Sequence, residues 1–178
     1  MSPLLRPPVE GTFPTYYGRY IDPLPDGPVL ELLADQVEET AALLDSIGED
    51  LAGYRYAEEK WSVKEVVGHV MDVERIFAAR ALRFARGDGT PLPAFEQNAY
   101  VANADFDARP LAALIEELRA LRASTLAMFR GFDAAALARA GTAAGGSFTV
   151  ASIAWIIAGH EAHHVRVLKE RYLPGLQG

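Results

Sequence analysis

The chain has 178 residues with no cysteine, and its 17 basic and 24 acidic residues give a formal net charge of −7. Without cysteine it cannot form disulfides, thiolate metal sites or a cysteine nucleophile, and it fits a cytoplasmic location. The acidic balance argues against general binding to a nucleic-acid backbone, and the most apolar stretch, 150–159, is too short to span a bilayer. We therefore expect one domain over residues 1–178, with neither nucleic acid nor membrane as a partner.

Proline placement separates an N-terminal arm, residues 1–27, from a body over residues 28–178. Seven of the 11 prolines lie in the first 28 residues, and the next one is Pro91. Such a segment cannot form a long helix. Its aromatic residues are of types that are often buried, and they predict an extended arm that packs on the body: Phe13, Tyr16, Tyr17 and Tyr20.

Four segments of the body carry apolar residues at helical spacing. We predict helices over these ranges: 28–47, 63 to about 87, 110–130, and 150 to a point before Pro174. Pro28 and Pro110 are expected at first helical positions. Ser62 and Glu65 form a capping box at the start of the second helix, and Thr149 is the expected N-cap of the fourth.

The arrangement of these segments predicts an all-α fold, a four-helix bundle. No segment shows sustained strand alternation, and residues 133–140 can form one short extra helix. The connection between the second and third helices, residues 87–109, is long, because bundle connections usually have about 2–8 residues. We expect this connection to act as a lid over a functional site.

The histidines are the chemically informative residues. His160 and His164 are four residues apart, so they project from one face of the fourth predicted helix, about 40° apart. Apolar residues share that face, which indicates that both rings point toward the bundle interior. His69 lies at the rim of the apolar stripe of the second helix. His163 falls off the inward face, so we expect it to pack or hydrogen bond rather than to bind metal.

Three imidazoles from two neighbouring helices are suited to a divalent transition metal. Three protein ligands leave a fourth position for water or substrate, which is typical of catalytic rather than structural sites. The alternative is that the histidines hydrogen bond to the backbone or to carboxylates and serve only the core.

Three segments of the chain resemble the DinB superfamily, and within it the YfiT-like metal-dependent hydrolases and thiol S-transferases. They read K-W-S-V-K-E-V-V-G-H-V-M-D-V-E (60–74), F-E-Q-N-A-Y (95–100) and G-H-E-A-H-H-V (159–165). The family has one histidine in the second helix and H-x-x-H-H in the fourth, and binds metal through the first histidine and the outer two of the triplet. In this chain those positions are His69, His160 and His164.

The resemblance implies a four-helix bundle with a Zn²⁺ or Ni²⁺ site, and a homodimer. Some members are similar to enzymes that conjugate low-molecular-weight thiols, such as bacillithiol, mycothiol or glutathione, to small electrophiles in stress or detoxification metabolism. Gly68 departs from the pattern, because many relatives carry a second histidine or a larger residue there.

Three functions stay open at this point. A bound divalent ion lowers the pKa of water or of a thiol, so the site suits either hydrolysis or attack by an external thiolate. Because the chain has no cysteine, the sulfur has to come from a cosubstrate. The third possibility is a non-catalytic metal-binding dimer with a stress-related interaction role.

Other residues are candidates for supporting the site. Metal-bound histidines usually donate their second N–H to a carboxylate or carbonyl, which makes Glu65, Asp72 and Glu161 candidates for orienting the ligands. Packing or surface roles are the alternative for these three. The candidate substrate-binding residues are Glu96, Gln97, Asn98, Tyr100 and, for an acidic cosubstrate, Arg166.

Overall fold

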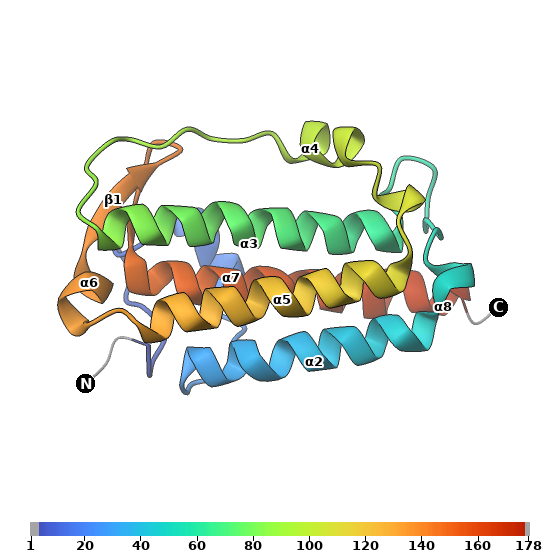
Figure 1. The fold of residues 1–178 in the computed structure, drawn as a ribbon, viewed down its shortest axis with the longest axis horizontal. Helices are drawn as coiled ribbons and strands as arrows, with labels where there is room; N and C mark the ends of the chain where they lie inside the picture. Colours follow the sequence, from blue (N-terminus) through green and yellow to red (C-terminus); the bar gives the residue numbers. More distant parts are fainter. Residues whose placement is uncertain (1–3, 177–178) are drawn as a thin grey trace.

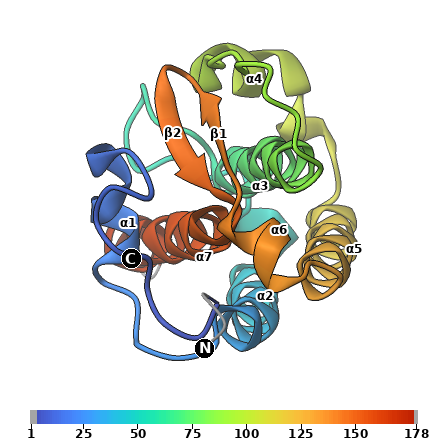
Figure 2. The same ribbon diagram turned by 90° about the vertical axis from the view of Figure 1, so that its left-hand side faces the viewer.

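Residues 4–176 are described by a computed structural model, in which four long helices run side by side (Figure 1). The long helices are α2 (Val29–Ile47), α3 (Val63–Ala85), α5 (Leu111–Arg130) and α7 (Val150–Val167). The helices α3 and α2 each pack against both α7 and α5, so the four axes enclose one core (Figure 2). The predicted all-α four-helix bundle is confirmed.

The helix starts follow the local sequence closely. The Ser62 hydroxyl accepts from the backbone N–H of Glu65 at 3.0 Å, and the Ser62 N–H donates to the Glu65 carboxylate at 2.8 Å, which completes the predicted capping box. Thr149 caps α7 through its hydroxyl, also as predicted. Pro28 and Pro110 are N-caps with extended backbone rather than first helical residues, so α2 and α5 begin one residue later than expected.

A short hairpin corrects the expectation of no strands. The strands β1 (Ala140–Ala143) and β2 (Gly146–Thr149) pair antiparallel, and the predicted extra helix is α6 (Ala134–Ala138). The two turn residues, Ala144 and Gly145, have φ values of 50° and 77°. A two-residue hairpin turn with positive φ at both positions matches the twist of the flanking strands. Strands of four mostly small residues carry too little alternation to be recognised in the sequence.

The last predicted helix continues past its expected end. A π-helical segment, Leu168–Tyr172, follows α7 and leads into α8 (Leu173–Leu176). Pro174 therefore lies inside a helix instead of just after one. It directly follows the π-helical turn, in which the Leu173 N–H donates to the carbonyl of Leu168.

The N-terminal arm packs on the bundle as expected, but it is not extended throughout. It contains a 3₁₀ turn, Thr15–Tyr17, and the short helix α1 (Gly18–Ile21), which lies against α7 (Figure 2). The Tyr17 ring packs edge-on against Phe77 and Phe148, with ring centroids 5.7 and 5.3 Å apart. The segment between Pro14 and Pro23 is free of proline, which allows these helical turns.

The long connection between α3 and α5 is partly helical and runs along α3 (Figure 1). It contains α4 (Gln97–Ala104) and a 3₁₀ turn, Phe106–Ala108; a further 3₁₀ turn, Glu49–Leu51, follows α2. The Glu96 carboxylate caps α4, because its oxygens accept from two backbone N–H groups of the first turn, at 3.2 and 2.8 Å.

Two apolar clusters fill the core, one toward each end of the bundle. The cluster near the hairpin includes Phe77, Phe84, Phe129, Phe148 and Trp155. The other includes Leu44, Met71, Leu114, Leu118 and Tyr172. Each long helix has at least one buried polar side chain between the two clusters: Gln36, Glu74, Arg122 and Glu161. Buried polar groups need partners, so this layer is where the bundle can hold chemistry.

The central polar layer is held together by one buried arginine. Arg122 of α5 donates to Glu74 of α3 at 2.8 Å, to Glu161 of α7, and to the carbonyl of Leu33 in α2 at 2.6 Å. Thr40, also in α2, donates to Glu161 at 2.7 Å. The cluster therefore joins all four long helices at one level of the bundle.

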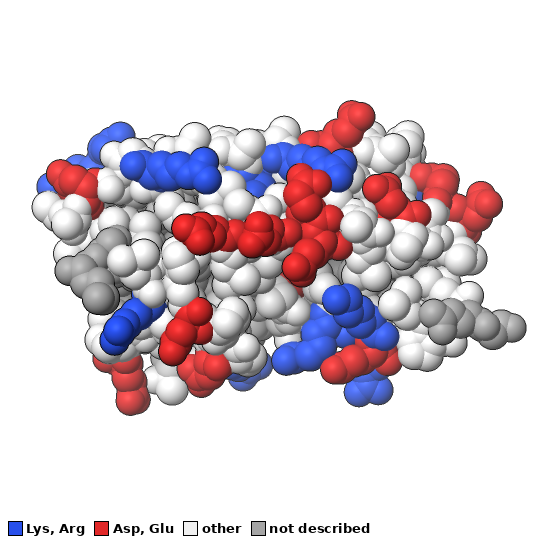
Figure 3. Space-filling model, turned by 90° about the horizontal axis from the view of Figure 1, so that it is seen from below, with Lys and Arg blue, Asp and Glu red and all other residues white. Residues whose placement is uncertain are grey.

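Charged side chains cover much of the face seen in Figure 3, where acidic groups gather across the centre with basic groups on either side. This distribution agrees with the net charge of −7. Within residues 4–176, none of the helices combines the length and the apolarity that crossing a membrane requires.

Candidate metal centre

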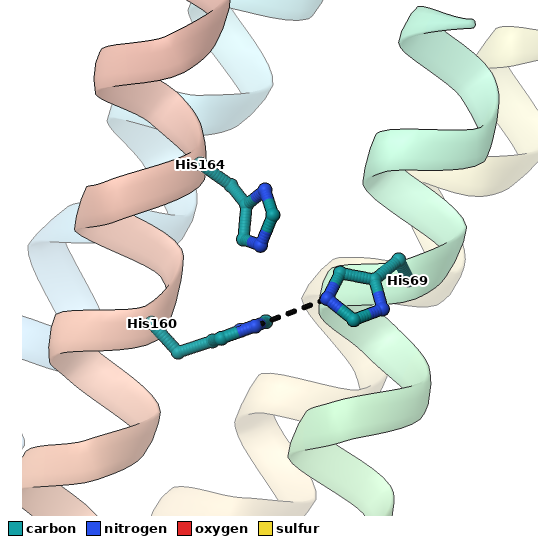
Figure 4. A group of neighbouring side chains, drawn as sticks. All are labelled: His69, His160 and His164. Carbon is teal, nitrogen blue, oxygen red and sulfur yellow. Dashed lines mark hydrogen bonds between the residues drawn. The ribbon is translucent and has the colours of Figure 1, made fainter. Parts of the chain in front are cut away.

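Three histidines meet between α3 and α7 (Figure 4). The Nε2 atoms of His69 and His160 lie 3.1 Å apart, and His164 supplies a third nitrogen, with all three atoms within 4.8 Å of one another. The ring centroids are 4.5–4.9 Å apart. His69, His160 and His164, which the helical spacing predicted, are therefore the residues whose rings the fold brings together.

Burial keeps these rings uncharged. It lowers the pKa of His69 to about 4, and it lowers the pKa of His160 well below the ordinary value. Burial, followed by the proximity of His69 and His163, lowers the pKa of His164 to about 3. Neutral imidazoles are the form that binds metal.

The donor set fits a divalent cation. Nε2 atoms of two buried imidazoles face each other, and within residues 4–176 no carboxylate hydrogen bonds to any of the three rings. Only one of two facing nitrogens can carry the shared proton, whereas a cation placed among the three nitrogens can use all of their lone pairs. Aromatic rings border the site: the ring centroid of Trp61 lies 4.7 Å from that of His69, and the ring centroid of Tyr20 lies 5.5 Å from that of His160.

Two glycines allow flanking segments to approach the histidines. A Cβ at Gly68, just before His69, would lie 2.3 Å from the Phe106 ring of the long connection. A Cβ at Gly159, just before His160, would lie 2.2 Å from the Tyr20 carbonyl oxygen of the arm. Gly68 stands where the family pattern has a larger residue, and packing explains the difference, because the Phe106 ring occupies the space that a larger side chain would need.

We predict that Gly159→Ala destabilises the protein. Helix propensity alone would favour alanine by about 1 kcal/mol. The new methyl group would instead collide with backbone of the arm, and overpacking of this kind typically costs about 1–3 kcal/mol. Urea denaturation should show a net loss of stability, while Gly53→Ala, which has open space around its Cβ, should change little. Equal stability of both variants and the wild type would contradict this packing.

His163 lies outside the cluster, as the sequence predicted. Its Nδ1 interacts with the Arg166 guanidinium at 3.2 Å, and its ring contacts Tyr20 at a centroid distance of 5.4 Å. It packs and hydrogen bonds beside the histidine cluster.

The three carboxylates predicted to orient the ligands have other partners. Glu65 accepts from Arg55 and from the capping N–H, Asp72 pairs with Arg75 at 3.8 Å, and Glu161 belongs to the central polar layer. Within the described residues none of them hydrogen bonds to a histidine ring. Glu161 directly follows His160 and therefore points to another side of α7. Glu65 and Asp72 have helical spacing to His69, but Arg55, the capping N–H and Arg75 engage them instead.

Two cavities flank the histidine cluster, and three of the predicted substrate-binding residues line one or the other of them. The first, about 320 Å³, is lined by His160 together with Glu96 and Gln97. The second, about 270 Å³, is lined by His164 together with Asn98. The helix α4 thus contributes to both, which supports its predicted place beside the site.

Two other predicted substrate-binding residues lie elsewhere. Tyr100 is 47% exposed and packs against Phe95, with ring centroids 5.5 Å apart. Arg166 lines a separate cavity together with Glu39 and Lys169. Arg166 follows His164 by two residues, so it points away from the inward face.

Sequence reasoning missed several residues that line the first cavity. They are Tyr16, Tyr17 and Tyr20 of the arm, and Phe77 and Arg80 of α3. The tyrosines were recognised only as packing residues. Arg80 could have been noticed in the sequence, because it is a basic residue within the apolar stripe of the helix that carries His69.

The chain is a four-helix bundle in which two of the helices bring three histidines together, two buried and one half-buried, as a candidate metal site with a cavity on each side. More particularly, the chain belongs to the DinB superfamily, whose family model matches residues 32–168. No curated protein matches the sequence.

Two solved structures share the fold. YfiT from Bacillus subtilis, described as a probable metal-dependent hydrolase with an unusual four-helix bundle topology, is 16% identical, has a TM-score of 0.71, and is matched over 98% of this chain and 96% of its own. A mycothiol-dependent maleylpyruvate isomerase is 17% identical with a TM-score of 0.64, over 77% of this chain and 58% of its own.

Proposed function

We propose that the protein is a metal-dependent enzyme that binds one divalent cation, Zn²⁺ or Ni²⁺, through His69, His160 and His164. The observation that carries the proposal is the convergence of three neutral imidazole nitrogens within 4.8 Å between two buried helix faces. Imidazole nitrogens are ligands that both of these cations accept readily. The relatives support the class of chemistry, because one is described as metal-dependent and the other as mycothiol-dependent.

The reaction we propose is transfer of a low-molecular-weight thiol, such as bacillithiol, to a small electrophile. The thiol sulfur forms a bond to the electrophilic carbon, the leaving group departs with its bonding electrons, and the thiol proton passes to solvent. A bound divalent cation supplies a positive charge that lowers the pKa of a thiol or of water. The chain supplies uncharged ligands and no cysteine, so the sulfur belongs to a cosubstrate.

Two cavities favour a reaction with two reactants. Each cavity includes a different histidine of the cluster, so two small molecules can approach the same centre from different sides. Gln97 lines one cavity and Asn98 the other, and each offers amide donors and acceptors. Hydrolysis of a small substrate would need only one cavity and water, and it is the alternative reaction for the same residues.

We predict that conjugation of a thiol to a reactive halide depends on the metal. Bacillithiol, mycothiol, glutathione and water are compared as nucleophiles, with chelator-treated protein and with the same protein after Zn²⁺ or Ni²⁺ is restored. At least one thiol should react at least tenfold faster with the metal-loaded protein. The control is Arg83→Gln, an exposed arginine of α3 that lines neither cavity, and it should retain activity.

The outcomes separate the three functions. A metal-dependent rate with water alone would replace thiol transfer by hydrolysis. Identical rates with and without chelator for every nucleophile, in protein that does hold metal, would support the non-catalytic metal-binding bundle instead. A homodimer and a cytoplasmic location stay predictions.

A further inference from the structure

Three lysine or arginine side chains are buried within residues 4–176, and they differ in their partners. Lys64 pairs with Glu49, and Arg122 pairs with Glu74 and Glu161. Arg80 is only 3% exposed, yet no carboxylate of the described residues lies within 4.0 Å of its guanidinium. A buried positive charge is costly unless an anion compensates it.

The immediate surroundings of Arg80 give its charge aromatic and polar neighbours, the rings of Phe77 and Phe95 among them, but no carboxylate. One guanidinium nitrogen, Nη2, donates to the Pro93 carbonyl at 2.9 Å, and the side chain lies over the Phe77 ring at 4.9 Å. Tyr17 is a further polar neighbour, and burial lowers the pKa of Arg80. A neutral amide could make the bond to Pro93, so that bond does not explain why a cation stands here.

Arg80 lines the same cavity as the metal-site residue His160. On α3, Arg80 follows His69 by 11 residues, roughly 16 Å along the helix axis. Side chains in a helix lean toward its N-terminus, so the guanidinium extends toward the histidines and shortens this gap. The wall of one cavity thus includes both a buried cation and a histidine of the proposed metal site.

The rest of the cavity suits a compact organic body. Its walls include the aromatic rings of Tyr17, Tyr20, Phe77 and Phe95. Its volume of about 320 Å³ is at the lower end of small-molecule sites, which span about 300–1,000 Å³. The one acidic wall residue, Glu96, is engaged in capping α4.

We propose that this cavity binds a small organic carboxylate, with Arg80 pairing to the carboxylate and the body of the molecule directed between the aromatic rings toward His160. The inference deepens the proposed function, on which it rests, by giving one reactant a carboxylate at the end remote from the reacting atom. A planar guanidinium matches a carboxylate through two parallel hydrogen bonds, which makes Arg80 the specificity-determining residue.

The first test uses metal-free protein, so that a carboxylate cannot bind to a metal. Calorimetric titration compares 4-methylbenzoate with the neutral 4-methylbenzamide. The wild type should bind the carboxylate roughly 10- to 100-fold more tightly, as expected for a hydrogen-bonded charge pair. Equal affinities would overturn the proposal, and this comparison needs no variant.

Variants locate the binding. Arg80→Gln should reduce the affinity for 4-methylbenzoate to that for the amide, and Arg80→Lys should retain part of the preference. The matched control is Arg83→Gln, one turn along the same helix, where the arginine is exposed and pairs with Asp88; it should bind as the wild type does. Unchanged carboxylate affinity in a folded Arg80→Gln protein would place the site elsewhere and overturn the proposal.

A kinetic comparison in metal-loaded protein shows which reactant carries the carboxylate. One arm combines 4-(chloromethyl)benzoate with a neutral thiol, and the other combines 4-(mercaptomethyl)benzoate with a neutral halide. A rise in KM caused by Arg80→Gln in one arm assigns the carboxylate to that reactant, and no rise in either arm contradicts the proposal. If the proposed enzymatic function fails, metal content and rates reveal it, whereas the metal-free titration still decides whether Arg80 binds a carboxylate.

Discussion

His160→Ala is expected to reduce the bound metal from close to one divalent ion per chain to almost none. His160 is the central ring of the cluster, since its Nε2 faces His69 and its ring lies 4.5 Å from that of His164. Loss of groups that merely orient a ligand typically weakens metal binding about 10- to 100-fold, and loss of the ligand itself should exceed this. Elemental analysis after reconstitution with Zn²⁺ or Ni²⁺ and desalting measures the content.

The matched control for this experiment is His163→Ala, because the two histidines lie on the same helix and both contact Tyr20. The control should keep its metal, while His69→Ala should lose it like His160→Ala. A thermal readout adds independent evidence, since metal at 100 times its dissociation constant stabilises the folded state by about 2.7 kcal/mol. Metal content that is the same in all four proteins would disprove the assignment of the ligands.

The histidine cluster was predictable because it depends on two strong local patterns. The capping box at Ser62 fixed where α3 starts, and the four-residue spacing of His160 and His164 placed both rings on one helix face. Neither pattern needs knowledge of the loops. Helix periodicity and bundle packing then bring the two faces together.

The first cavity was not predictable, because segments far apart in the sequence build it. Tyr20 comes from the arm, Arg80 from α3 and Gln97 from the connection. Helix periodicity contains no information about how an arm or a connection folds back onto a helix. The carboxylates predicted to orient the ligands have other partners, which lie close in sequence for Asp72, with Arg75, and far away in sequence for Glu161, with Arg122.

We expect Arg122→Met to cause the largest loss of stability among single substitutions in the polar layer. Arg122 is 1% exposed, and its replacement leaves the buried carboxylates of Glu74 and Glu161 without their cationic partner, although Thr40 still donates to Glu161. Breaking a buried ion pair by removing one partner typically costs about 3–5 kcal/mol. Burial opposes the charge of Arg122, but the attraction and hydrogen bonds of Glu161 and Glu74 prevail and raise its pKa above the ordinary value.

Urea denaturation of two further variants distinguishes the loss of stability caused by unpaired buried charges from the loss that any arginine-to-methionine substitution causes. Arg119→Met removes an exposed arginine one turn earlier on α5, which pairs with Glu38, and should cost at most about 1 kcal/mol. Adding Glu74→Gln and Glu161→Gln to Arg122→Met removes the uncompensated charges and should restore part of the lost stability. If the triple variant is less stable than Arg122→Met alone, the penalty does not come from unpaired carboxylates. Glu161 directly follows His160 in α7. Loss of the Arg122–Glu161 ion pair in Arg122→Met should therefore also weaken metal binding, because it loosens the orientation of α7.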